Sequence, residues 1–456
     1  MAASNVELKR QIGLYAATAI TVGNIIGSGI FRSPHGVAQE LPGFALVIAA
    51  WVLGGVLSIC GSLVLTELAV RHPKTGGLYV FIREGFGDAW AFVFGWANLW
   101  VIKPTVIASI TSVFALYFCQ AVHLPHTAEF GVGCVAILVL TFVNWLGVKQ
   151  GAGTQSLFTT AKLLGIVALC GFAFLLPASH PATPIEHPVV AANAGHPLLL
   201  AFALSMITIL FAYDGWTDST YVAGEVRDPQ RVMPIAILGG TWLVIAVYVL
   251  TNFAYYHVLT PNEVAGYEAV GSETIHRLLG DWGARALAVL VAVSTFGTTN
   301  GAILTGPRVT QAAAADGLLW KPLAALDPRR ETPARALWVQ AVLSCVWLWA
   351  AGGFDDVSGW FVTTSWLFYA VTTATLFVQR ARERRGEQGA ASYRTPLYPL
   401  TPLVFLVVTA VIIWSDFTHS GPIPGTPIPR AMAGVIIAAT GFPVYALFWR
   451  RRTTVS

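Results

Sequence analysis

Two apolar stretches of the chain contain residues that α-helices disfavour. The first includes Gly23–Gly29, with the sequence GNIIGSG, and the second includes the pair Asp214-Gly215. Glycine destabilises a helix interior by about 1 kcal/mol relative to alanine. A single glycine often marks a close contact between membrane helices, but a Gly-Ser-Gly cluster and an Asp-Gly pair indicate interrupted helices. An interrupted backbone presents free N–H and C=O groups, which can bind charged groups of a ligand.

Two lysines lie within apolar stretches, where an unpaired charge is costly. Lys103 lies near the middle of residues 89–119, and Lys162 lies inside residues 156–177. Lys103 is either a buried ion-pair or carbonyl anchor, or a residue that acts in gating or side-chain selection. Lys162 either extends its ammonium to the membrane surface or places it in the protein interior.

The composition indicates that these residues belong to a membrane protein. Of the 456 residues, 55% are hydrophobic and only 11% are charged, whereas soluble proteins carry about 25% charged residues. The mean hydropathy is +0.65. A chain with so little polar surface cannot cover a soluble domain of this size, and the net charge of +4 gives no indication of nucleic-acid binding.

A membrane-spanning helix requires about 20 mostly apolar residues. On this criterion the sequence predicts twelve spans, at residues 12–32, 41–69, 89–119, 129–147, 156–177, 199–222, 234–258, 285–312, 335–350, 359–379, 399–416 and 431–449. We expect one membrane domain covering residues 1–456. Within it, residues 12–177 and 199–379 form two five-helix halves, and residues 399–449 add two helices. The interruptions fall in the first helix of each half, which is typical of a transporter built from inverted repeats.

Lysine and arginine are concentrated in the connections on the side of the two predicted termini. By the positive-inside rule, both termini are expected in the cytoplasm. We therefore predict a multi-pass protein of the cell membrane, specifically a bacterial inner membrane. Glu225 and Arg231 lie in one cytoplasmic connection, and we expect them to form a charge network that helps close this side.

No residue pattern indicates catalysis or a bound cofactor. The five cysteines lie in or beside apolar stretches without a C-x-x-C spacing, so we interpret them as small buried hydrophobic residues. The sequence shows neither a metal-ligand set nor a Ser/His pair at a membrane interface. We expect a protein that is not an enzyme and has no metal or cofactor.

Several motifs along nearly the whole chain resemble the amino acid–polyamine–organocation (APC) superfamily and, within it, the L-type amino acid transporter (LAT) family. They are VGNIIGSGIF (22–31), PKTGGLY (73–79), VIKPT (101–105), FTTAKL (158–163), FAYDGW (211–216), EVRDPQRVMP (225–234), Asn300-Gly301 and Trp366. The resemblance implies an all-α LeuT-type fold, with a five-plus-five inverted repeat, broken helices 1 and 6, and two further helices.

The resemblance also implies where a zwitterionic amino acid would bind. Its carboxylate would meet Ser28 and Gly29, and its ammonium would meet carbonyls around Ile25, Phe211 and Asp214. Trp216 and Thr217 would border the side-chain pocket, and bulk at Gly27 or Gly29 would obstruct the close backbone approach. In LeuT-type carriers that work without sodium, a lysine at the position of Lys162 can occupy the space of a sodium ion.

The expected function is therefore sodium-independent transport of L-amino acids across the membrane by alternating access. The sequence leaves exchange and proton-coupled uptake open. Asp214 could be a counter-ion for a cationic side chain, so neutral amino acids are favoured only narrowly over cationic ones. A non-transporting amino acid sensor is a further alternative.

Two features depart from the animal members of the family. The connection at 121–128, where those members often carry a cysteine that bonds to a partner chain, has none; Cys119 lies at the preceding helix end. We therefore expect no disulfide-linked partner, and only substrate and membrane lipid as binding partners. Arg32, directly after the first motif, has no explanation in the sequence.

Overall fold

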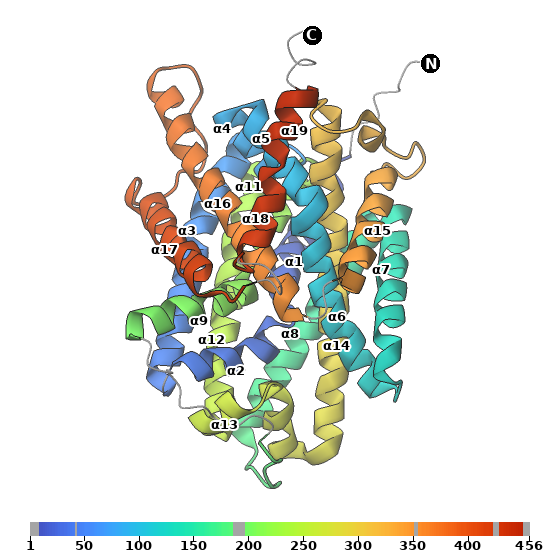
Figure 1. Ribbon diagram of the computed structural model, residues 1–456, viewed down its shortest axis with the longest axis vertical. Helices are drawn as coiled ribbons and strands as arrows, with labels where there is room; N and C mark the ends of the chain where they lie inside the picture. Colours follow the sequence, from blue (N-terminus) through green and yellow to red (C-terminus); the bar gives the residue numbers. More distant parts are fainter. Residues whose placement is uncertain (1–8, 42, 186–196, 351–353, 423–427, 450–456) are drawn as a thin grey trace.

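The computed structural model describes residues 9–41, 43–185, 197–350, 354–422 and 428–449. Within these residues the regular structure is helical, and β pairing is limited to two isolated bridges, Ile12–Val226 and Pro422–Pro429. This arrangement agrees with the predicted all-helical protein (Figure 1).

The helices within residues 9–185 are α1 (Leu14–Ile25), α2 (Gly29–Glu40), α3 (Phe44–Arg71), α4 (Leu78–Phe86), α5 (Asp88–Ala97), α6 (Lys103–Ala121), α7 (Glu129–Leu146) and α8 (Val148–Leu175). They are followed by α9 (Leu198–Tyr213), α10 (Asp218–Tyr221), α11 (Pro229–Pro234), α12 (Gly240–Val258), α13 (Pro261–Gly266), α14 (Val270–Ala315), α15 (Ala334–Ala350) and α16 (Phe354–Arg384). The chain continues with α17 (Leu400–His419), α18 (Met432–Ala439) and α19 (Gly441–Val444).

In the described part of the chain, ten helical segments are long and apolar enough to cross a membrane. Two shorter apolar helices, α9 and α15, lie at the other two predicted spans. The predicted boundaries differ most at 285–312, because α14 begins earlier, at Val270. Gly280 adopts a φ of 66° within α14 and kinks it, and the sequence analysis identified only the part after this kink.

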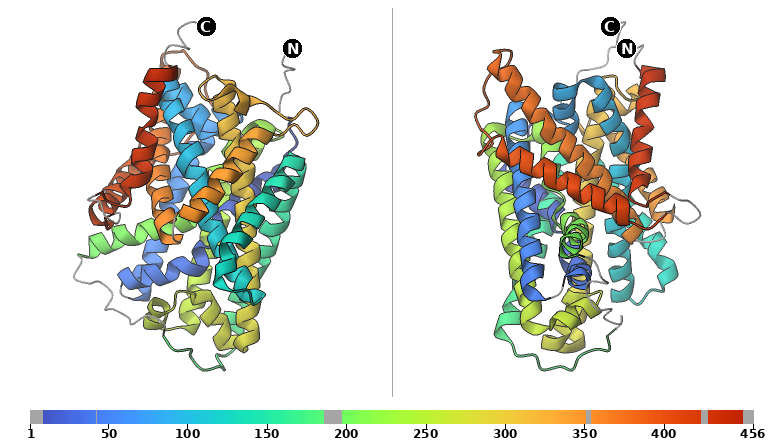
Figure 2. Two further views of the ribbon diagram at one scale, coloured as in Figure 1. Left: turned by 45° about the vertical axis from the view of Figure 1, so that its right-hand side comes forward. Right: turned by 60° about the vertical axis from the view of Figure 1, so that its left-hand side comes forward.

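The long helices run roughly side by side, and both ends of the described chain lie at the same end of the bundle (Figure 1). We call this the termini side; α13 lies at the opposite end. Helices α8, α12 and α14 contact α1, so the first broken helix lies inside the bundle. On one flank, α16 and α17 pack against each other (Figure 2).

Both interruptions expected from the sequence occur at the centre of the molecule. Helix α1 ends at Ile25 and α2 begins at Gly29, while α9 ends at Tyr213 and α10 begins at Asp218. Gly215, between the latter two helices, adopts a φ of +121°. A Cβ atom on Gly215 would lie 2.6 Å from the backbone carbon of Asn24. Glycine is therefore required at this position both by its backbone conformation and by the contact between the two interruptions.

Candidate functional site

A small central cavity of about 30 Å³ lies between the two interruptions. It is lined by Asn24, Ile25, Gly27, Ser28, Gly29, Val106, Ile110, Phe211, Asp214, Thr298 and Phe361. Six of the eight residues predicted to bind a substrate are therefore together at one cavity. The space accommodates about two water molecules, so a larger ligand requires the walls to move apart.

The two other predicted site residues lie elsewhere. Trp216 is fully buried, and its ring packs against Tyr369 and Phe405 at centroid distances of 5.3 and 6.2 Å. Thr217 is also buried but does not line the central cavity. The positive φ of Gly215 turns the chain at this point, which directs Trp216 toward α16 and α17.

Helix α2 presents its N-terminus to the central cavity. Ser28 precedes the helix, and its buried hydroxyl has no hydrogen-bond partner among the described residues. The first N–H groups of a helix have no partner in a preceding turn, and the helix dipole favours an anion at this end. The start of α2 can therefore bind a carboxylate through the Ser28 hydroxyl and the backbone.

The start of α2 is packed closely against the end of α9. A Cβ atom on Gly29 would lie 2.6 Å from both Cα and Cβ of Ala212. A Cβ atom on Gly27 would meet Thr298 at 3.5 Å, which is ordinary contact. A larger side chain was expected to be obstructive at both glycines. The structure leaves no space for one at Gly29, because α9 is too close, whereas Gly27 has space for a methyl group.

Tyr248 of α12, which the sequence analysis missed, joins the two interruptions. Its hydroxyl lies 2.9 Å from the carbonyl oxygen of Ile25 and 3.0 Å from that of Ala212. The carboxylate of Asp214 accepts a hydrogen bond of 2.7 Å from the hydroxyl of Tyr369, in α16. The oxygen atoms around the central cavity are therefore held in place by tyrosines from two other helices.

The ammonium group of Lys162 lies in the interior, at the C-terminal end of α1. It donates to the carbonyl oxygens of Gly23 at 2.9 Å and Ile26 at 2.5 Å, and to the hydroxyl of Thr298 at 2.8 Å. The side chain is fully buried, so its ammonium does not extend to the membrane surface. A positive charge here interacts favourably with the negative end of the α1 dipole.

Lys103 forms a buried ion pair with Asp218 of α10, with 2.7 Å between Nζ and Oδ1. The amide of Asn24 donates to the other carboxylate oxygen at 2.5 Å, and the hydroxyl of Thr305 lies 3.2 Å from it. Breaking such a pair leaves a buried charge without compensation. Asp218 and Asn24 were missed by the sequence analysis, although both belong to the polar segments at the two interruptions.

Of the two residues expected in a charge network on the termini side, Glu225 forms a buried ion pair and Arg231 does not pair with it. Glu225 instead pairs with Arg308 of α14 at 3.0 Å, and both side chains are buried. Arg231 is exposed, and no ion pair to its side chain occurs among the described residues. Asp228 adopts a left-handed conformation before α11, and this turn separates Arg231 from Glu225.

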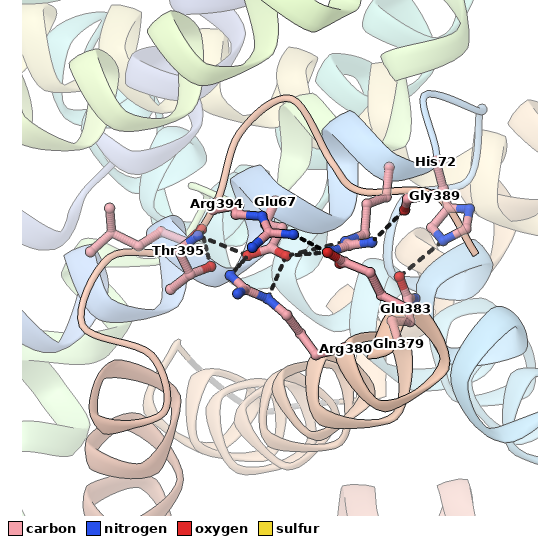
Figure 3. A network of polar contacts seen from close by, with 10 residues as sticks. Glu67, His72, Gln379, Arg380, Glu383, Gly389, Arg394 and Thr395 are labelled. Atoms are coloured by element: carbon pink, nitrogen blue, oxygen red, sulfur yellow. Dashed lines mark hydrogen bonds and ion pairs between the residues drawn. The ribbon is translucent and has the colours of Figure 1, made fainter. Parts of the chain in front are cut away.

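The termini side is closed by two further sets of contacts. The backbone of Gln11 and Ile12 pairs with that of Glu225 and Arg227 at 2.8–2.9 Å. In addition, the buried carboxylate of Glu67 in α3 accepts hydrogen bonds from Arg71, Arg380 and the backbone N–H of Thr395 (Figure 3). The first set joins the segment before α1 to the segment before α11, and the second joins α3 to α16 and to the segment before α17.

Two larger cavities lie toward the opposite end, next to the central cavity. Cavity A, of about 450 Å³, includes Ser28, Arg32, Glu268 and Arg285 in its lining. Cavity B, of about 370 Å³, includes Arg32, Phe211 and Glu268. Ser28 and Phe211 also line the central cavity, so cavities A and B each share a wall residue with it.

Comparison with known proteins identifies relatives over the whole chain. The amino acid permease family matches residues 12–442. The serine/threonine exchanger SteT of Bacillus subtilis (strain 168) is 30% identical over 450 residues, covering 98% of both chains. The b(0,+)-type amino acid transporter 1 of Mus musculus is 31% identical, covering 97% of this chain and 88% of that protein. The Asc-type amino acid transporter 1 of Mus musculus is 33% identical, covering 99% and 84%.

Proposed function

Because the chain belongs to the amino acid permease family, a family of multi-pass membrane transporters, we propose that it is a sodium-independent carrier of L-amino acids. It works by alternating access, as an exchanger or an uptake carrier, and it prefers neutral substrates. The proposal includes twelve membrane spans, with α9 and α15 as the two short ones, in a five-plus-five inverted repeat followed by two helices. The termini side faces the cytoplasm of a bacterial cell.

The buried ammonium of Lys162 carries the sodium-independent part of the proposal. It has three oxygen partners, two of them carbonyls at the end of broken helix α1. A bound metal cation would require a similar set of oxygens at the same place. Because the lysine supplies the positive charge covalently, the end of α1 is stabilised without a cation from solution.

The sizes and positions of the cavities support alternating access. The larger cavities A and B lie toward the opposite end, while three sets of contacts close the termini side. We interpret this conformation as one that faces outward, with a contracted central site. Opening to the cytoplasm requires the Glu67 contacts, the Glu225–Arg308 pair and the pairing of residues 11–12 to separate.

The lining of the central cavity supports a neutral amino acid as substrate. The substrate carboxylate binds at the start of α2, and its ammonium binds near Asp214 and the carbonyl of Ile25. Val106, Ile110 and Phe361 provide an apolar surface for the side chain. One relative is named as a serine/threonine exchanger and another as a b(0,+)-type amino acid transporter. We therefore compare neutral and cationic amino acids as substrates.

The function is tested by uptake of radiolabelled L-amino acids into liposomes that contain the purified protein, in sodium-free choline buffer. We expect uptake above that of protein-free liposomes, inhibited by an excess of unlabelled L-substrate and not by the D-enantiomer. An absolute requirement for sodium would contradict the proposal. So would a failure to take up any amino acid tested, both by empty liposomes and by liposomes preloaded with amino acid.

Replacing Asp214 distinguishes the two substrate classes. We expect Asp214→Asn to reduce uptake of both alanine and arginine by about tenfold or more, because the carboxylate faces the ammonium that both substrates carry. Tyr369→Phe, which removes the hydrogen bond to Asp214 and keeps the charge, is the control and should have a smaller effect. Loss of arginine uptake alone would show that Asp214 is a counter-ion for a cationic side chain.

A further inference from the structure

Arg32, which neither the sequence nor the central site explains, lies on the wall shared by cavities A and B. Its guanidinium lies 3.9 Å from the carboxylate of Glu268, which lines the same two cavities. The side chains are 30% and 49% exposed. Both side chains are therefore partly exposed at the wall of the two cavities, where a ligand can reach them.

The pair also lies on the route to the central site. The backbone N–H of Arg32 bonds to the carbonyl of Ser28 at 3.2 Å, so Arg32 lies about one turn of α2, or about 6 Å along the helix, beyond Ser28. The buried hydroxyl of Ser28, which lacks a partner among the described residues, belongs to the linings of both cavity A and the central cavity. A carboxylate that leaves Arg32 can therefore bind next at the Ser28 hydroxyl, about one helical turn away.

We propose that Arg32 and Glu268 form an outer docking site for the amino acid zwitterion, which the substrate occupies before it enters the central cavity. Arg32 binds the carboxylate, Glu268 binds the ammonium, and cavity A receives the side chain. The inference rests on the proposed transport of amino acids. Cavity A has the volume that the central cavity lacks in this conformation, about 450 Å³ against 30 Å³.

The charge of cavity A gives this site a preference among amino acids. Arg285 also lines it, so the described lining carries two arginines and one glutamate. When Arg32 binds the carboxylate and Glu268 the ammonium, Arg285 is the charged group of this lining that remains for the side chain. An uncharged side chain is not repelled by it, whereas a cationic side chain approaches a like charge. The docking site thus favours neutral over cationic substrates independently of Asp214.

The site is tested by transport kinetics in sealed vesicles of defined orientation. For Arg32→Gln and for Glu268→Gln, we expect the KM for external alanine to rise about tenfold, the effect of losing one charge-assisted contact. The maximal rate and the KM measured from the cytoplasmic side should stay within about twofold, because the central site is intact. Arg430→Gln, at an exposed arginine outside both cavity linings, is the control.

A charge-swapped protein distinguishes two roles of the Arg32–Glu268 pair: binding the substrate, or only holding α2 against the segment before α14. Arg32→Glu combined with Glu268→Arg restores an ion pair but places the positive group away from Ser28. If the pair only holds the two segments together, the swapped protein should recover the normal external KM; if it docks the zwitterion, the raised KM persists. Elution in size-exclusion chromatography and thermal unfolding verify that each variant is folded.

The outcomes distinguish this inference from the proposed function. Normal uptake by the unmodified protein with an unchanged external KM in both single variants would overturn the docking site and leave the transport function intact. Recovery in the swapped protein would also overturn it. The wild-type protein gives a further measurement, because salt screens partly exposed charges. Its external KM should rise with ionic strength, and that of Arg32→Gln should not.

Discussion

Replacing Lys162 with alanine should reduce transport by about a hundredfold or more. The change removes an ammonium that donates to the carbonyls of Gly23 and Ile26 and to Thr298. Each charge-assisted hydrogen bond contributes about 1.5–3 kcal/mol, and the carbonyls at the end of α1 would be left in a cavity. The loss should be measured as initial uptake in sodium-free buffer, with and without added sodium.

The control for this variant is Lys149→Ala, which changes an exposed lysine at the start of the same helix, α8. Lys162→Met, which keeps most of the side-chain length without a donor, tests whether volume alone matters. We expect Lys149→Ala to transport normally and Lys162→Met to be as impaired as Lys162→Ala. A folded Lys162→Ala protein with wild-type transport would show that the ammonium is dispensable and would remove the main support for sodium independence.

Gly29→Ala should also abolish most transport, for a steric reason. The new methyl group would lie 2.6 Å from Cα and Cβ of Ala212, so α2 or α9 must shift where both line the central cavity. Overpacking of this kind costs about 1–3 kcal/mol, and here the strain falls on the two half-helices that form the site. We expect uptake to fall at least tenfold while the protein remains folded in the membrane.

Gly36→Ala is the matched control for Gly29→Ala, because it lies in the same helix and its Cβ would meet only Thr208, at 3.8 Å. This variant should keep its transport and gain slightly in stability, since alanine favours helix. Equal behaviour of the two variants, measured by uptake and thermal unfolding, would contradict the close packing of α2 on α9.

The sequence predicted the central site where local backbone preference determines the structure. The GNIIGSG segment and Asp214-Gly215 disfavour a continuous helix, and both interruptions occur at the expected residues. The family resemblance led to the expectation that Trp216 borders the side-chain pocket, whereas its ring packs against Tyr369 and Phe405. Local patterns do not specify the direction in which a chain leaves a turn.

Residues whose role depends on distant parts of the chain could not be identified from the pattern. Glu225 was assigned to a charge network, but its partner proved to be Arg308, which lies 83 positions later. Tyr248 and Asp218 likewise become significant only when α12 and α10 are packed beside α1. Buried polar residues in membrane helices indicate that a partner exists, but tertiary packing determines which one.

The position of Tyr248 has a consequence for the energy of ligand binding. The single hydroxyl proton of Tyr248 is shared between the carbonyl oxygens of Ile25 and Ala212, and each carbonyl keeps a second lone pair. The two interruptions are thus already aligned before an ammonium arrives, so little of the binding energy is needed to order them. The same hydroxyl couples the movements of the two broken helices: if α1 and α9 move apart, Tyr248 must give up its contact with one of the two carbonyls, at a cost of about 1 kcal/mol.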